Sequence, residues 1–170
     1  MTLADCLRDP NLFGRFFRNK SWRTWRVFLA ALLAEAIDEA GLAVYRACTG
    51  RTAWPTAPFA EAALIVGRRG GKSRILALIA VYLATMRDYA PYLAPGEVAT
   101  IAVLASDRAQ ARVIFRFVLG LLQAVPLIKP LIVDHDSEII TLRNRVVIEI
   151  ATASFRTARG YSFAASGSLL

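Results

Sequence analysis

The sequence predicts an α/β protein in which a mainly parallel sheet is flanked by helices. Two strand-like apolar runs, residues 62–66 and 100–105, are each followed by a helical pattern of apolar residues, over residues 72–89 and up to about residue 123. Strands that alternate with helices along a chain are typical of a parallel sheet, because a parallel connection must cross back over the sheet. Ser106 or Asp107 can cap the second helix.

The last part of the sequence interrupts this alternation. Beyond Pro126 and Pro130 the apolar runs become short, at residues 131–133, 138–142 and 146–152. The last two are joined by Arg143-Asn144-Arg145, a polar connection of hairpin length. We therefore expect a late β-hairpin within the α/β pattern.

The amino-terminal part of the chain is expected to be mostly helical. Residues 12–40 carry one apolar stripe at three- and four-residue spacing, formed by Trp22, Trp25, Phe28, Leu29, Leu32, Leu33 and Ala36. A second helix over residues 43–47 should end at Thr49-Gly50, and the prolines of residues 51–59 predict a linker. The expected division is a helical segment with its linker, residues 1–58, and a core, residues 59–170.

Composition narrows the class of protein. The 170 residues are 56% hydrophobic, but no apolar run reaches the ~20 residues of a membrane-spanning helix, and the amino terminus lacks the layout of a secretory signal. Two cysteines, Cys6 and Cys48, support no disulfide framework, which favours a reducing cytoplasm. The net charge of +8 suggests a polyanionic partner, although arginines also serve on solvated helix faces.

Residues 64–73 read Leu-Ile-Val-Gly-Arg-Arg-Gly-Gly-Lys-Ser, the layout of a phosphate-binding loop between a strand and a helix. Gly67, Gly70 and Gly71 permit the backbone angles that turn N–H groups into one concave space. Lys72 would reach the terminal phosphates of a nucleotide, and the Ser73 hydroxyl would ligate Mg²⁺. The helix start adds unpartnered N–H groups that attract anions. The sequence therefore predicts a P-loop NTPase that binds ATP and Mg²⁺.

The spacing departs from the usual pattern. Val66 stands where the first glycine of the loop belongs, and Gly67 follows one place later. A surface turn of glycines and basic residues remains the alternative.

Several segments in order resemble the amino-terminal ATPase domain of the tailed-bacteriophage large terminase subunit, the motor that drives DNA into a capsid. The resemblance covers about residues 22–165. The most specific combination is Gly-Arg-Arg-Gly-Gly-Lys-Ser at residues 67–73 with Arg-Gly-Tyr-Ser-Phe at residues 159–163; the other segments are the Trp/Arg-rich helix at 22–33, Thr-Gly-Arg at 49–51, Pro-Gly-Glu at 95–97, Ala-Ser-Asp-Arg at 105–108 with Gln-Ala at 110–111, and Thr-Ala-Ser at 152–154.

The resemblance implies roles for individual residues. The whole loop, including Arg69, would hold ATP, with Lys72 and Ser73 on ATP and Mg²⁺. Arg68 corresponds to an arginine proposed to sense the γ-phosphate, and Arg159 to one thought to reach a neighbouring subunit's nucleotide; both would act on the charge that develops in phosphoryl transfer. Their alternative role is that of solvated surface cations. The implied partners are double-stranded DNA, the portal, the small terminase and further copies of the chain, in the cytoplasm of a bacterial host.

The chain departs from the family after Ala165. In relatives the next strand ends in Asp-Glu, which completes the Mg²⁺ shell and activates water, whereas here Ser-Gly-Ser-Leu-Leu follows at residues 166–170. A nuclease domain would also be missing. We expect a truncated, hydrolysis-deficient fragment.

Three rival interpretations stay open, one of which is a decayed gene product with no role. Asp134, after the apolar run 131–133, could supply the Mg²⁺ carboxylate of a small complete P-loop enzyme, although Pro130 and the hairpin favour an edge position for it. Alternatively the chain is a non-enzymatic DNA-binding remnant that uses the basic stretch 15–26 and the arginine face at residues 108–116.

Overall fold

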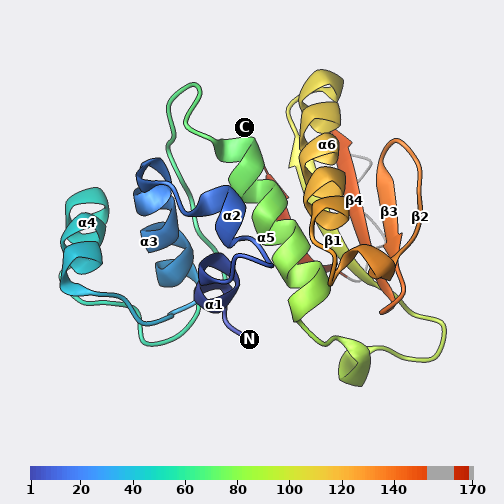
Figure 1. Cartoon of the computed structure of the whole chain (residues 1–170), viewed down its shortest axis with the longest axis horizontal. Helices are drawn as coiled ribbons and strands as arrows, with labels where there is room; N and C mark the ends of the chain where they lie inside the picture. The colour runs from blue at the N-terminus through green and yellow to red at the C-terminus, as the bar shows by residue number, and fades with distance from the viewer. Residues whose placement is uncertain (153–162, 169–170) are drawn as a thin grey trace. The chain divides into compact units, whose positions relative to one another are not determined.

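The structure, a computed structural model, describes residues 1–152 and 163–168. The chain packs as two units, Met1–Gly67 and Arg68–Leu170. The predicted division after residue 58 falls within the first of them. Each unit has its own secondary structure, which Figure 1 labels along the chain.

The first unit is helical, as predicted. Its elements are α1 (Leu3–Arg8), α2 (Gly14–Phe17), the 3₁₀ turn η1 (Lys20–Trp22), α3 (Arg23–Leu32) and α4 (Glu39–Thr49). The N-cap of α4 is Asp38, whose carboxylate accepts from the Gly41 N–H at 2.7 Å. Its C-cap is Gly50, whose φ of 70° lies in the left-handed region that glycine tolerates best.

α1 was not predicted, although the sequence carries its start signal. The Thr2 side chain accepts from the Asp5 N–H, and the Asp5 carboxylate accepts from the Thr2 N–H, which is a capping box. The side chain and then the backbone N–H of Thr2 lower the pKa of the Asp5 carboxyl group. A Thr-x-x-Asp pattern before an apolar residue could have located this helix.

The apolar stripe predicted for residues 12–40 is confirmed in part. Of its seven residues Leu29 is buried, five are half-buried and Ala36 is exposed. Val27 and Ala31, which the predicted stripe omitted, are also buried and pack with Tyr45 of α4. Within the stripe, Trp22 packs edge-on against the buried Phe17 ring, with the ring centroids 5.1 Å apart.

The predicted linker and the residues after it, 51–67, have no helix or strand. They are nevertheless tied to the first unit: the Trp54 indole N–H donates to the Glu35 carbonyl at 3.1 Å, and the Phe59 N–H donates to the Leu32 carbonyl at 2.9 Å. This segment is therefore irregular backbone held by specific contacts.

The second unit contains two long helices and a five-stranded sheet. Its elements are α5 (Lys72–Met86), η2 (Ala90–Tyr92), β1 (Ala99–Ala105), α6 (Arg108–Ala124), η3 (Lys129–Leu131), β2 (Ile132–His135), β3 (Ile139–Leu142), β4 (Val146–Thr152) and β5 (Phe163–Ser168). The predicted helices, the strand at 100–105 and the β-hairpin are confirmed. No helix of the described residues is long and apolar enough to cross a membrane.

The sheet has the order β2-β3-β4-β1-β5. β1 pairs in parallel with β4 and β5, whereas β2 with β3 and β3 with β4 are antiparallel. The expectation of a mainly parallel sheet is therefore corrected to a mixed one, because the β3–β4 hairpin and the pairing of β2 with β3 are both antiparallel.

The strand predicted at residues 62–66 is absent from the sheet. This segment is irregular, with Leu64 47% and Ile65 106% exposed. A five-residue apolar run becomes a strand only where a ladder partner is available. Residues 62–66 pair with neither of the edge strands of the sheet, β2 and β5.

α5 and α6 lie side by side over one face of the sheet (Figure 1). The core between the helices and the sheet is formed by fully buried side chains, including Leu78 of α5, Ile114 of α6 and Ile148 of β4. Alternate residues of β4 from Val146 to Ile150 are buried, which is the period expected of a strand with one face on a core.

The direction of α5 relative to the strands follows from one hydrogen bond. The Asn144 side-chain amide in the hairpin turn donates to the Ala84 carbonyl in the last turn of α5 at 2.8 Å. The next residue, Arg145, accepts from the N–H of Ala99, the first residue of β1, at 2.9 Å. The carboxyl end of α5 therefore lies at the amino ends of β1 and β4. A 15-residue helix and a seven-residue strand are each about 23 Å long, so the first turn of α5 reaches the opposite edge.

Candidate phosphate-binding site

The loop before α5 is curled by two residues with positive φ, Arg69 at 60° and Gly71 at 85°. Glycine adopts this region freely, whereas an arginine there is strained. Such conformations turn successive backbone N–H groups toward one side and form anion-binding concavities. Gly71 therefore has the kind of backbone angle for which a glycine was expected at this position.

α5 begins directly after this curl. Gly71 is its N-cap, and the Gly71 carbonyl accepts from the N–H groups of Arg74 and Ile75, each at 3.1 Å. Lys72 and Ser73 are consequently the first two residues of a 15-residue helix, where the N–H groups point away from the helix and the dipole favours an anion.

The predicted loop residues lie where solvent and a ligand can reach them. Gly67, Arg68, Arg69 and Gly70 are exposed, and Gly71, Lys72 and Ser73 are half-buried. A Cβ atom at Gly67 would meet no described atom within 4 Å, so space does not require glycine at this position.

The first turn of α5 lies at the edge where the parallel strands end. β1 ends at Ala105 and β4 at Thr152, and β5 runs in the same direction, with its Ser168 opposite Leu104. In open α/β sheets, ligands bind outside the carboxyl ends of the strands. The loop therefore stands at the edge of the sheet where nucleotides are bound in such folds.

A polar cluster at the same edge was predicted only as a helix cap. The Asp107 carboxylate accepts from the Gln110 N–H at 2.8 Å and from the Ser106 hydroxyl at 3.2 Å, and Ser106 also contacts the Gln110 side chain. The hydrogen bond from Gln110 lowers the pKa of Asp107, so the carboxylate stays ionised. Polar residues directly after a parallel strand were the signal that could have placed this cluster near the loop.

Asp134 lies away from the loop. In the sheet register, Asp134 is opposite Thr141, Thr141 opposite Val147, and Val147 opposite Thr100, the second residue of β1. This row runs along the amino ends of the parallel strands, the edge opposite the first turn of α5. Asp134 is exposed on the edge strand β2, as its neighbouring proline predicted, and the register excludes it as a Mg²⁺ partner of Ser73 in this fold.

The remaining predicted site residue, Arg159, lies outside the described residues. Within the described ranges, no three His, Cys, Asp or Glu side chains form a group that could hold a metal ion. Mg²⁺ commonly takes only one or two ligands from a protein and the rest from phosphates and water, which is compatible with the Ser73 hydroxyl alone at the helix start.

Cys6 is fully buried, and this burial raises the pKa of its thiol to about 11, which keeps it protonated and unreactive.

No protein-family model and no curated protein matches the sequence. Among solved structures, the chain matches the crystal structure of the HK97 bacteriophage large terminase with a TM-score of 0.53 over 88% of its length. The fold is similar to that of a phage large terminase. Sequence identity over the match is 18%, and the match spans 30% of the terminase chain. The predicted resemblance to the terminase is confirmed at the level of the fold.

Proposed function

We propose that residues 67–73 bind ATP with Mg²⁺. The observation that carries this proposal is the curled Arg-Gly-Gly-Lys-Ser segment, which leads into the first turn of α5 at the edge where β1 and β4 end. The fold similarity to a terminase supports it independently of the sequence motif. A surface turn would explain the glycines and basic residues, but not their position at this edge.

The roles follow from the chemistry of each group. The Lys72 ammonium is a mobile point charge suited to the terminal phosphates, and the Ser73 hydroxyl offers the oxygen that Mg²⁺ prefers. Arg68 and Arg69 are exposed beside them and can approach phosphate oxygens in two-pronged contacts. When bound, Mg²⁺ supplies neutralisation of the phosphate charge.

A Ser73→Ala variant tests the metal part of the proposal. Calorimetric titration of the 170-residue chain with ATP is expected to show binding that weakens several-fold when EDTA removes Mg²⁺. With or without Mg²⁺, the Ser73→Ala variant should bind ATP with about the affinity that the wild type shows in EDTA, because the side chain that couples Mg²⁺ to the protein is gone. Asp134→Asn is the control and should leave the titration unchanged, since Asp134 lies at the opposite edge. Equal Mg²⁺ dependence in wild type and Ser73→Ala would contradict the assignment.

We further propose that this 170-residue segment binds ATP without turning it over. The two carboxylates that the terminase resemblance assigns to Mg²⁺ and to water activation do not occur in residues 163–170. General-base catalysis contributes typically 10²–10⁴-fold, so the segment alone should release phosphate no faster than a Lys72→Ala control. Robust phosphate release that depends on Lys72 would overturn this view.

Contact with double-stranded DNA is a second proposed function, favoured by α6. Arg108, Arg112 and Arg116 are exposed at four-residue spacing and therefore line one face of this helix. Arginines on one helix face suit the phosphates of a nucleic acid backbone, and the net charge of +8 adds long-range attraction.

The salt dependence of DNA binding tests this face. Each neutralised phosphate contributes about −0.9 to the slope of log K against log salt concentration. The double variant Arg112→Gln/Arg116→Gln is expected to reduce the slope by about two. Lys129→Gln/Arg143→Gln carries the same change in charge at exposed positions elsewhere in the unit and should change it less. Equal slopes for both double variants would show that total charge, rather than the α6 face, governs binding.

A further inference from the structure

The first unit contains an open cavity of about 740 Å³ that the phosphate loop does not use. It lies between α1, the start of α3 and the segment that leads into α4, so all of its lining residues belong to Met1–Gly67. Ligand sites in proteins commonly have volumes of about 300–1,000 Å³. The cavity is therefore large enough for a small organic molecule.

The lining has two chemically distinct parts. Apolar side chains form one part, among them Leu3 and Leu7 of α1, Val27 and Ala30 of α3, and Ile37. The other part carries four arginines, Arg8, Arg18, Arg23 and Arg26. An anionic ligand with an apolar body would meet complementary surface on both.

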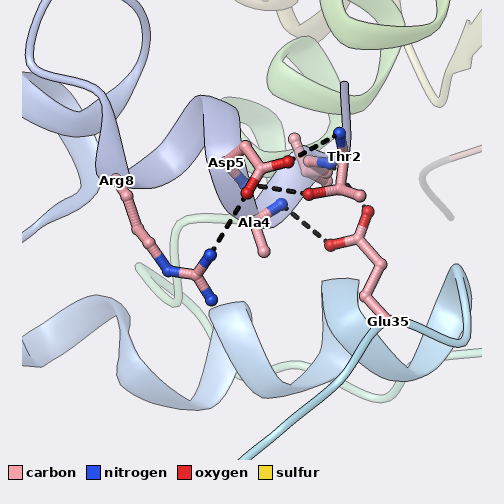
Figure 2. A network of polar contacts seen from close by, with 6 residues as sticks. Thr2, Ala4, Asp5, Arg8 and Glu35 are labelled. Carbon is pink, nitrogen blue, oxygen red and sulfur yellow. Dashed lines mark hydrogen bonds and ion pairs between the residues drawn. The ribbon is translucent and has the colours of Figure 1, made fainter.

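The two carboxylates in the lining are already engaged by the backbone. Glu35 accepts from the Leu3 N–H at 2.7 Å and from the Ala4 N–H at 2.8 Å, one hydrogen bond to each oxygen. Asp38 accepts from the Gly41 N–H as the N-cap of α4. Figure 2 shows Glu35 directed at the first turn of α1. Because four arginines face two carboxylates that are held by N–H groups, the cavity is electropositive.

Two of the arginines are fixed in place by the protein. Arg26 donates to the carbonyls of Phe17, at 2.7 Å, and Asn19, at 3.1 Å, and Arg8 forms an ion pair with Asp5 at 3.2 Å (Figure 2). Arg18 and Arg23 are exposed, and no contact from either to a carboxylate appears among the described residues. Arg18 and Arg23 are thus the arginines best placed to close on an anion.

We propose that this cavity binds a nucleoside monophosphate, with the phosphate on Arg18 and Arg23 and the base against the apolar lining. Guanidinium groups match phosphate oxygens in two-pronged hydrogen bonds and also lie flat on bases. Inorganic phosphate would leave the apolar part unused, and a nucleoside would leave the arginines unused. The nucleotide can be free or can stand at the 5′ end of a single strand, because both present the same phosphate and base.

The test is equilibrium binding of AMP to the full chain at low salt. AMP is expected to bind at least about tenfold more tightly than inorganic phosphate or adenosine, since only AMP meets both parts of the lining. The double variant Arg18→Gln/Arg23→Gln should weaken AMP binding about tenfold, a loss of about 1.4 kcal/mol. The charge-matched variant Lys129→Gln/Arg143→Gln, at exposed positions of the second unit, should leave it unchanged.

Two further arms separate this site from the phosphate loop and identify the source of the nucleotide. Lys72→Ala should leave AMP binding unchanged, because Lys72 does not line the cavity. The ATP and AMP titrations therefore test the loop and the cavity separately, and either proposal can fail without the other. A short single-stranded oligonucleotide with a 5′ phosphate is then tested as a competitor of AMP. Competition that requires the 5′ phosphate assigns the site to strand ends, and no competition assigns it to free nucleotides. Inorganic phosphate binding as tightly as AMP, or equal AMP binding by the Arg18/Arg23 variant, would overturn the proposal.

Discussion

Lys72→Ala is expected to weaken ATP binding by the chain between about tenfold and a hundredfold. A hydrogen bond to a charged group is worth about 1.5–3 kcal/mol, and each 1.4 kcal/mol is a factor of ten in affinity. Lys72 is half-buried in the first turn of α5, where its ammonium adds to the N–H groups and the helix dipole. Fluorescence titration with a labelled ATP analogue in the presence of Mg²⁺ measures the change.

The matched control is Lys129→Ala, which removes the same charge from an exposed residue at the start of η3. It should leave the affinity within about twofold, as expected of one distant, screened charge. Equal losses in the two variants would mean that ATP responds to net charge, and the loop would then be an ordinary basic turn. Unchanged affinity in Lys72→Ala would remove Lys72 from the site.

Leu78→Ala is expected to destabilise the second unit by about 2–5 kcal/mol. Leu78 is fully buried on α5, so its truncation removes apolar burial and leaves a cavity between the helix and the sheet. One kcal/mol shifts the midpoint of a domain of this size by roughly 4–8 °C, so the unfolding midpoint should fall by about 10 °C or more. Urea titration followed by circular dichroism measures the free energy directly.

Leu76→Ala is the matched control, because it makes the same substitution two residues earlier on the same helix. Leu76 is half-buried, so it should cost distinctly less than Leu78→Ala while changing helix propensity equally. Equal destabilisation by both variants would contradict the orientation of α5 on the sheet.

The sequence predicted those elements whose signal is local and complete. α5 and α6 have apolar patterns more than ten residues long, and the hairpin of β3 and β4 has both strands and their polar connection next to each other in the chain. The strand predicted at residues 62–66 was wrong because the local signal is incomplete. Only tertiary pairing decides whether so short an apolar run becomes a strand. Val27 and Ala31 of α3 were missed because the larger apolar residues dominate the periodic pattern, although both pack against α4.

For the candidate site, the sequence identified the residue types but not their surroundings. The order Gly-Gly-Lys-Ser indicates a helix start, and α5 does begin at Lys72. Ser106 and Asp107 lie at the same edge of the sheet as this loop, whereas Asp134 does not. These positions depend on strand order and register, which no local sequence pattern encodes. The cavity in the first unit could not be predicted from the sequence either, because its arginines come from three separate segments.

The division of the chain at Gly67 bears on how its stability should be described. Each part has its own set of buried side chains, such as Phe13 and Phe17 before the division and Tyr82 and Ile150 after it. All-or-none melting is a property of single cooperative units, and a chain with two of them need not satisfy the equality of calorimetric and van't Hoff enthalpies. Two midpoints, each with its own heat of transition, are the appropriate description. A ligand that binds only the second unit would raise the second midpoint and leave the first unchanged.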